Sequence, residues 1–144
     1  MNRKPRILWS NSFCLLDTAS GASISVREIL HQLERRGFEV MILGATIFDN
    51  PNGVVRFGEK WESIKNSGKD FIIIEDGALK HNLVITKSTN RSQMSMDENN
   101  SLISNYYQAL REFKPDLVFF YGGHPIDAFF PYEARIREIP SVAY

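Results

Sequence analysis

Two short polar stretches contain the residue types that could bind or transform a ligand. The first covers residues 12–23 and holds Ser20, Gly21 and Ala22 just before a segment with helical periodicity. Gly21 allows close approach of the backbone, and a helix that begins at about Ser23 would present free N–H groups and its positive dipole end to an anion. A diphosphate would suit this loop. Gly21 could equally serve only to permit a tight turn.

The second stretch, residues 121–125, directly follows an apolar run. Its Tyr121, Gly122 and Gly123 suggest contact between the backbone and a bound molecule. His124 is the histidine that this pattern places at a strand end, where it could reach a substrate. Both stretches follow strands that we expect to be parallel, so both should emerge at the same edge of one sheet.

Four other reactive residues have simpler explanations. His31 lies beside the charged side of a predicted helix and is expected to be structural or solvated, while His81 begins a predicted strand and is expected to be solvated. Asp127 either orients His124 or caps the helix that follows. Cys14, the single cysteine, has apolar neighbours and is expected to be packed rather than nucleophilic.

Three common kinds of ligand site have no support in the sequence. No group of histidine, cysteine and acidic residues has metal-ligand spacing. The first loop is not followed by the Gly-Lys-Ser/Thr of a Walker motif, and it has one glycine where a dinucleotide fingerprint needs three. We therefore expect neither a metal nor a cofactor.

A strand, a helix and a second strand must position the first loop. Residues 7–9 form an apolar run, as is typical of a strand buried on both faces of a parallel sheet. An amphipathic helix follows with Ser23 or Ser25 as its predicted cap, and Gly37 ends it before a strand at residues 39–43. Such crossovers are right-handed, which places the loop at the carboxyl edge of the first strand.

The later chain is predicted to continue the alternation of helices and strands. We expect a turn at residues 50–53, a short helix at residues 59–67 with Trp61 in the core, paired strands at residues 71–74 and 79–85, a mobile surface loop at residues 88–100, a helix at residues 102–113 and strands at residues 117–121 and 141–144. The helix between the last two strands should begin near Phe129 or Phe130, because Pro131 fits a first turn. Phe129, Phe130 and Tyr132 could form a membrane-contacting patch or a buried helix face.

Composition indicates one folded domain. The chain has 144 residues, of which 43% are hydrophobic and 24% charged. Seventeen basic and seventeen acidic residues give a formal net charge of zero, so no overall field favours nucleic acid or an anionic membrane. No apolar run is long enough for a signal peptide or a membrane span, and we expect a cytoplasmic protein. The pattern predicts a Rossmann-like three-layer α/β domain over residues 1–144, with a mostly parallel sheet and a β-hairpin excursion.

Several motifs, in this order, resemble family 4 glycosyltransferases, which are two-domain enzymes of the GT-B fold. Members carry a glycine pair after the first strand, and Ser20 and Gly21 stand there with serine for the first glycine. Residues 37–40, Gly-Phe-Glu-Val, resemble the family's Gly-His-Glu-Val entry to the second strand. Residues 114–118 and 139–142 resemble the segments that enter two later strands.

The resemblance implies a hexosyltransferase-type enzyme that moves a sugar from a nucleotide-sugar donor to an acceptor hydroxyl without a metal. It implies a catalytic role for His124, since a family histidine at the end of a later strand lies by the anomeric carbon. The implied substrate-binding residues are Ser20, Gly21, Ala22, Tyr121, Gly122 and Gly123. The family's C-terminal donor domain has no counterpart in these 144 residues. We therefore expect the N-terminal, acceptor-side part of a longer enzyme, inactive alone.

Two other functions fit the same residues. A non-enzymatic α/β binding module is one, because Thr18, Ser20 and Ser23 partly supply a flavodoxin-like phosphate loop. A receiver domain of that class would need paired acidic residues where Asn11 and Ser12 stand. The second is a partner subunit that keeps the acceptor domain without a donor domain. The length of the natural chain would distinguish this subunit from the two-domain enzyme.

Overall fold

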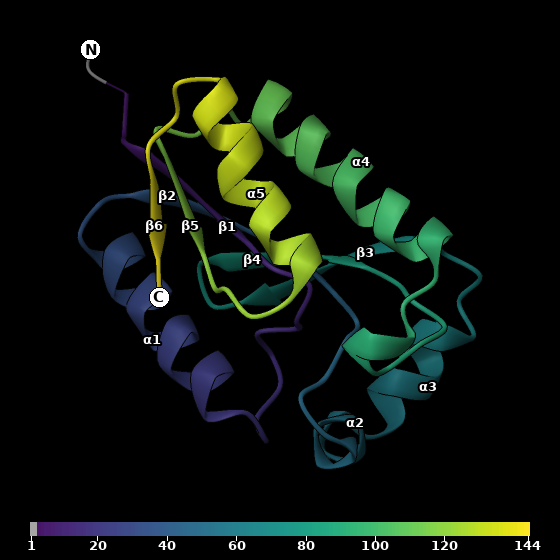
Figure 1. The fold of residues 1–144 in the computed structure, drawn as a ribbon. Coiled ribbons are helices and arrows are strands. Elements are labelled where there is room, and N and C mark those ends of the chain that lie inside the picture. Colours follow the sequence, from purple (N-terminus) through teal and green to yellow (C-terminus); the bar gives the residue numbers. More distant parts are fainter. Residues whose placement is uncertain (1–2) are drawn as a thin grey trace.

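Helices alternate with strands along residues 3–144, the part of the chain that the computed structural model describes (Figure 1). The strands are β1 (Arg6–Ser10), β2 (Glu39–Ala45), β3 (Phe71–Asp76), β4 (Leu79–Val84), β5 (Leu117–Phe120) and β6 (Ser141–Ala143). The helices are α1 (Gly21–Arg35), α2 (Pro51–Phe57), α3 (Glu59–Lys65), α4 (Met96–Glu112) and α5 (Pro125–Ile136), with a 3-10 turn, η1 (Arg91–Gln93).

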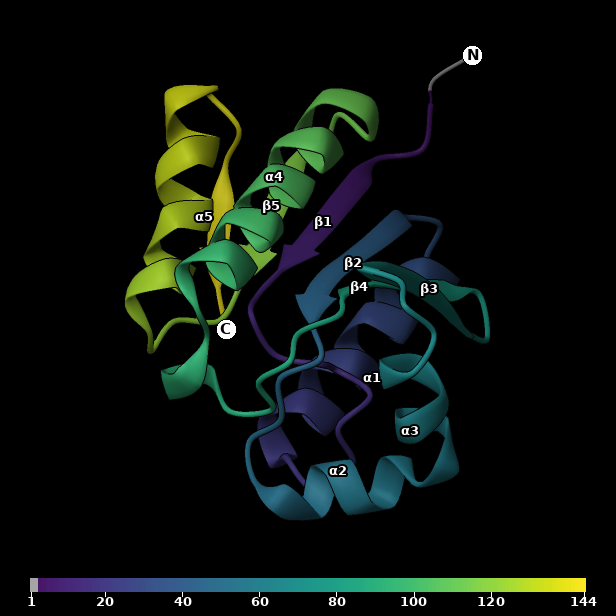
Figure 2. The same ribbon diagram turned by 90° about the vertical axis from the view of Figure 1, so that its right-hand side faces the viewer.

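The strands form one sheet in the order β3-β4-β2-β1-β5-β6. All neighbours pair in parallel except β3, which is antiparallel to β4 and forms the predicted hairpin with it. Figure 2 shows α4 and α5 on one face of the sheet and α1 on the other. The predicted Rossmann-like three-layer architecture is therefore confirmed.

The strand order reverses between β1 and β5. The parallel strands β4-β2-β1-β5-β6, numbered by their order in the chain, run 3-2-1-4-5 across the sheet. Flavodoxin-like and receiver domains have the order 2-1-3-4-5, so the sheet is not of that type. Open α/β sheets bind ligands outside the carboxyl ends of the strands at such a reversal. The end of β1 and the end of β5 are therefore where a site is expected.

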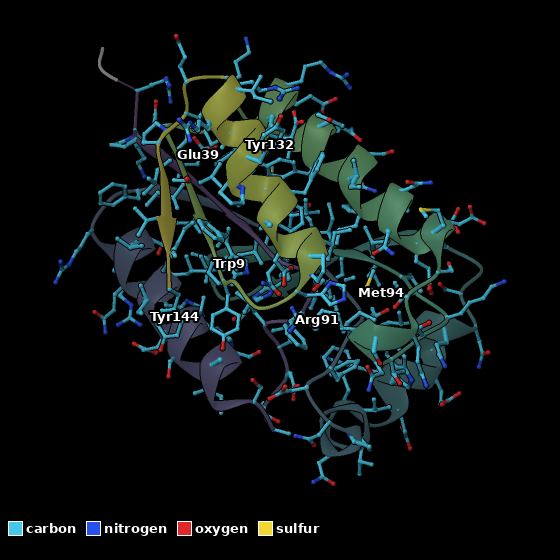
Figure 3. All side chains as sticks on the ribbon, in the orientation of Figure 1. Trp9, Glu39, Arg91, Met94, Tyr132 and Tyr144 are labelled. Carbon is cyan, nitrogen blue, oxygen red and sulfur yellow. The ribbon has the colours of Figure 1, made fainter. Side chains whose placement is uncertain are left out.

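Apolar layers pack against both faces of the sheet. On the α4 and α5 face, Tyr106 and Phe130 are fully buried, and the Tyr106 hydroxyl donates to the Phe130 carbonyl at 2.6 Å. On the α1 face, the rings of Trp9 and Phe119 meet edge-on with centroids 5.0 Å apart. On α5, Tyr132 is exposed (Figure 3) whereas Phe130 is fully buried. The aromatic residues of this helix therefore do not form one exposed patch. No helix within residues 3–144 has the length and apolar character needed to cross a bilayer.

The first two helices begin differently from the prediction. α1 begins at Gly21, and its cap is Ser20, whose Oγ accepts the Ser23 N–H at 3.3 Å. The predicted caps Ser23 and Ser25 lie inside the helix. The predicted turn that begins at Asn50 is instead the start of α2, with Asn50 as its cap and a proline in its first turn.

α5 begins about one turn earlier than predicted. It starts at Pro125, and the ring nitrogen Nδ1 of His124 accepts the Ile126 N–H at 3.4 Å. Pro131 consequently lies inside the helix, where its missing N–H deprives the Asp127 carbonyl of its usual helical donor. The apolar face that α5 packs on the sheet outweighs this defect.

The polar segment that was predicted as a mobile loop contains ordered elements. α4 begins at Met96, with Ser95 and Glu98 in a reciprocal capping box. The Glu98 carboxylate also accepts the N–H groups of Lys87 and Ser88 at 2.6 and 3.1 Å. Burial would raise the pKa of Glu98, but these N–H donors outweigh burial and lower it. The contacts fix η1, which lies between them in the chain.

His81 is fully buried, not solvated as predicted. Its Nε2 lies 3.3 Å from Oδ2 of Asp76, which is also 2.9 Å from Nε2 of His31 and 2.5 Å from Nε of Arg27. Burial lowers the pKa of His81 to about 4. Hydrogen bonds from Arg27 hold the pKa of Asp76 well below its usual range. This cluster ties α1 to the β3–β4 hairpin.

Candidate functional site

A cavity of about 110 Å³ lies at the carboxyl ends of β1 and β5, where the strand order reverses. Its walls come from β1, the start of α1, η1 and the loops after β1, β2 and β5. Polar residues that line it are Asn11, Ser20, Ser23, Asp49 and Arg91. A larger hollow of about 410 Å³ lies over the sheet beside α4, away from the strand ends. The smaller cavity is therefore the one that the topology favours.

The start of α1 forms one wall. Ser20 and Ala22 line the cavity, and the N–H groups of Gly21 and Ala22 have no acceptor inside the helix. Gly21 is exposed and its φ is not positive, and a Cβ built on it meets nothing within 4 Å. Neither a tight turn nor close packing within the described chain therefore requires glycine at this position.

The ends of β1 and β5 are joined directly. Asn11 Nδ2 donates to the Tyr121 carbonyl at 2.8 Å, and Asn11 Oδ1 accepts the Phe13 N–H at 2.8 Å. All three residues line the cavity. The prediction that the two polar loops emerge at the same edge of the sheet is confirmed.

Arg91 reaches the cavity from η1. Its Nη1 forms an ion pair with Oδ2 of Asp127, and its guanidinium carbon lies 4.0 Å from the centroid of the Phe13 ring. Asp127 is fully buried, and its Oδ1 accepts both the N–H and the hydroxyl of Ser12, at 3.3 and 3.2 Å. Burial raises the pKa of Asp127, and the Arg91 charge opposes the rise. The ion pair, the ring and Ser12 together fix the guanidinium.

Trp9 lines the cavity and carries a buried polar atom without a partner. The residue is 1% exposed, and its Nε1 has no hydrogen-bond partner within residues 3–144. Leaving a buried donor unpaired costs about 1–3 kcal/mol. Trp9 and Arg91 both line the cavity, and Figure 3 shows both in the interior near the ends of β1 and β5. The accessible area of Nε1 is below 1 Å², so the indole N–H is buried away from the cavity space.

The structure brings some of the predicted site residues together and leaves others outside. Those that line the cavity are Ser20, Ala22 and Tyr121. Those that do not line it are Gly21, Gly122, Gly123 and His124. Gly123 has φ of +137°, a conformation that side chains disfavour, so the turn itself requires this glycine.

Asp127 has neither of the roles that the sequence suggested. The cap of α5 is His124, and Asp127 contacts Arg91 and Ser12 rather than the histidine side chain. The sequence pattern does not single out Arg91, because it predicts a loop for the segment that carries this residue. The Ser95 and Glu98 capping box was the signal that could have shown order there.

The site offers donors and a cation rather than a nucleophile. Burial raises the pKa of Cys14 to about 12, so its thiol stays protonated near neutral pH. Within residues 3–144, no group of three or more histidine, cysteine and acidic side chains could hold a metal ion. Asp49 is exposed at the rim and could accept hydrogen bonds from hydroxyl groups. This set of groups suits an oxyanion attached to a hydroxyl-bearing molecule.

Comparisons with known proteins assign neither a family nor a function to this chain. No protein-family model matches this chain, and no curated protein matches it. The evidence for function is therefore the motif pattern, the strand order and the contacts around the cavity at the ends of β1 and β5.

Proposed function

We propose that this chain is the N-terminal, acceptor-side domain of a glycosyltransferase that moves a sugar from a nucleotide-sugar donor to an acceptor hydroxyl. The observation that carries the proposal is the cavity at the reversal of strand order, with the start of α1 in its wall. Open α/β sheets bind ligands at this place, and helix starts favour phosphate groups. The order of the glycosyltransferase-like motifs along the chain adds support.

The proposed chemistry is displacement at the anomeric carbon of the donor sugar. Negative charge then develops on the departing diphosphate. The N–H groups of Gly21 and Ala22 and the Arg91 guanidinium are fixed before the reaction begins, so they can stabilise this charge without rearrangement. A helix dipole alone contributes about 0.3–1 kcal/mol to the binding of a nearby anion, which makes the guanidinium the stronger contributor.

His124 has a defined part in the proposal. Its Nδ1 accepts a hydrogen bond at the start of α5, which leaves Nε2 as the nitrogen that carries the proton in the neutral ring. In the proposed role, Nε2–H donates to the sugar or to the acceptor near the reacting carbon. Gly122 and Gly123, which precede the histidine, would allow close approach of the substrate.

The experiment that tests this function is nucleoside diphosphate release by the protein made from its natural reading frame. UDP-, GDP- and ADP-sugars are supplied in turn, each with a panel of hydroxyl-bearing acceptors, and the exposed α5 variant Arg135→Gln is the control. Saturable release from one donor, retained in the control, is expected. Absence of release from every donor would contradict the proposal, and release by the 144-residue chain alone would show that no second domain is needed.

One alternative stays compatible with the sheet. A partner subunit with an acceptor-side domain alone would bind the acceptor without cleaving a nucleotide sugar. Saturable acceptor binding without nucleoside diphosphate release would favour that subunit over the enzyme. The flavodoxin-like alternative has lost its structural basis, because the sheet has a different strand order.

A further inference from the structure

We infer that two copies of this chain associate through β3, an edge strand of the sheet, in an antiparallel arrangement about a two-fold axis. The axis passes between the two Ile72 residues, so that each copy places its Ile72 opposite the Ile72 of the other. The inference does not depend on the proposed sugar transfer, because association between copies can be measured without any substrate.

The strand β3 is a regular edge with one open side (Figure 2). It is last in the sheet order, so that side has no neighbouring strand within residues 3–144. Its pairing with β4 runs residue by residue from Phe71 to Asp76 without a bulge, and the strand contains no proline. Proteins protect sheet edges with prolines, bulges or very short strands, and the three-residue β6 at the other edge is an example. The unprotected edge of β3 favours pairing with another chain.

The backbone of β3 directs hydrogen-bonding groups to its open side at every second residue. Antiparallel strands alternate between residue pairs that exchange hydrogen bonds and pairs that do not. The Ile85 N–H donates to the Asp70 carbonyl at 2.9 Å, which directs Asp70 and every second residue after it toward β4. The residues between them direct their N–H and C=O groups outward. These residues are Phe71, Ile73 and Glu75.

A second copy of the same strand carries the matching set of outward groups. A two-fold axis brings two identical strands together in antiparallel orientation, with the same patch on both copies. When the two Ile72 residues lie opposite each other, Phe71 lies opposite Ile73 of the second copy. Both of these residues direct their backbone groups outward, so they can exchange hydrogen bonds, and symmetry repeats the pair on the other side of the axis.

Charged residues at the two ends of the strand select this register. Lys69 falls opposite Glu75 of the second copy, and symmetry repeats this pair at the other end. Opposite charges that face each other across paired strands stabilise a sheet, whereas like charges destabilise it. A register centred on Ile73 would instead place Asp70 opposite Asp76 of the second copy. Charge complementarity therefore favours pairing about Ile72.

Apolar side chains extend along both faces of β3. On the α4 face, Phe71 and Ile73 line the hollow beside that helix, and Ile73 is 53% exposed. On the other face, Ile72 and Ile74 are half-buried against the cluster that contains Trp61. Pairing would cover the exposed edge of these side chains and place an aromatic residue opposite a β-branched one on the α4 face, a combination that stabilises sheets.

Sedimentation velocity measures the association. The purified protein is compared at concentrations from about 1 µM to about 1 mM, which covers weak as well as moderate affinities. An equilibrium between monomer and dimer is expected, without larger species, because the two-fold pair leaves no β3 edge open. A monomer at every concentration, or open-ended polymers, would overturn the inference.

Matched variants compare the two edges of the sheet. Ile73→Lys and Val142→Lys each replace a β-branched residue of an edge strand, and these residues are 53% and 49% exposed. Ile73→Lys should weaken dimerisation at least about 10-fold, because lysine on an edge strand opposes pairing. Val142→Lys should change the dimerisation constant less than about 2-fold, an allowance for a nonspecific charge effect. Weaker dimerisation of Val142→Lys alone would contradict the inference and place the interface at β6.

An exchange of charges tests the register. Lys69→Glu places two glutamates opposite each other, and Glu75→Lys places two lysines opposite each other, so each variant alone should dimerise about 10-fold more weakly than the wild type. In a mixture, the two variants carry opposite charges at both ends of the interface and should form a heterodimer with about the wild-type affinity.

Circular dichroism first checks the fold of Glu75→Lys, because Glu75 also lies opposite Lys80 within the hairpin. Folded variants whose mixture does not recover the dimer would refute the register. Lys69→Glu leaves the β3–β4 pairs unchanged. Dimerisation of this variant with the wild-type affinity would therefore refute the register by itself.

Discussion

His124 combines a structural contact with a proposed catalytic one, and the two can be separated. Asparagine caps helices well, so His124→Asn should keep the hydrogen bond at the start of α5, whereas His124→Ala should lose it and about 1 kcal/mol of stability. Both variants lack the imidazole. If Nε2–H meets the substrate, both should reduce nucleoside diphosphate release by about 10-fold or more.

Chemical denaturation and release assays on the two variants check this prediction. The wild-type protein provides the reference for both measurements. Full activity in His124→Asn would show that the histidine serves only as the cap of α5.

His81 should make the protein sensitive to mild acid. Its pKa of about 4 in the folded chain is below the ordinary histidine pKa of 6.5, so the unfolded chain binds the proton more tightly. The stability that the neutral imidazole contributes is therefore fully present above about pH 6.5 and is lost as the pH falls through about 4, by about 3 kcal/mol in total. The depressed pKa of Asp76 adds a further loss at lower pH.

Melting temperatures between pH 4 and pH 8 check this dependence. His81→Phe should flatten the curve between pH 6.5 and pH 4, because the buried imidazole no longer takes up a proton. A wild-type curve that is flat over this range would show that burial does not depress the His81 pKa in the folded protein.

Single residues were the hardest features to predict from the sequence. Burial of Cys14 followed from its apolar neighbours and is confirmed. The burial of His81 depends on Asp76 and on α1, and the role of Arg91 depends on Asp127, which is distant in the sequence. Such contacts have no local signal. The unpaired Nε1 of Trp9 likewise depends on tertiary packing that the sequence does not show.

The start of α1 is the element that the proposed function depends on, and its cap can be tested. Ser20→Ala removes the hydroxyl that accepts the Ser23 N–H and should cost about 1 kcal/mol of unfolding free energy. Ser25→Ala, at an exposed position inside the same helix, should cost nothing and could stabilise slightly. Urea denaturation of both variants is the measurement. A larger loss of unfolding free energy in Ser25→Ala than in Ser20→Ala would show that Ser25 is the cap, as the sequence suggested.

Elements were predicted well where periodicity was strong. The β3–β4 hairpin and the existence of α4 followed from apolar runs and spacing. The predicted helix starts were wrong where a single polar capping residue determines them. Ser20, Asn50 and His124 each cap a helix, and several equally good caps or turn residues stand near each of them in the sequence.

The sheet as a whole explains why two distant loops share one site. The alternation of strands and helices was sufficient to predict a Rossmann-like sheet, because parallel strands with helical crossovers have few arrangements. The position of the reversal between β1 and β5 needed the structure. The reversal brings together loops that are about one hundred residues apart in the sequence, and the cavity lies between them. The hydrogen bond from Asn11 to Tyr121, with a sequence separation of 110 residues, joins these loops.

Gly21→Val tests whether something outside the described chain approaches the start of α1. No atom of the described residues lies within 4 Å of a Cβ at this position, so valine should change the unfolding free energy by less than about 1 kcal/mol. Ser25→Val is the matched control, because it adds the same side chain at an exposed position of the same helix.

Nucleoside diphosphate release by the natural protein is the deciding measurement. The proposed function predicts that Gly21→Val lowers the rate of release at least about 10-fold, because a ligand or a second domain would meet the added methyl groups. Ser25→Val should release nucleoside diphosphate at close to the wild-type rate. The unfolding free energy of both variants should stay close to that of the wild type. Release by Gly21→Val at the wild-type rate would contradict the claim that a diphosphate binds at the start of α1.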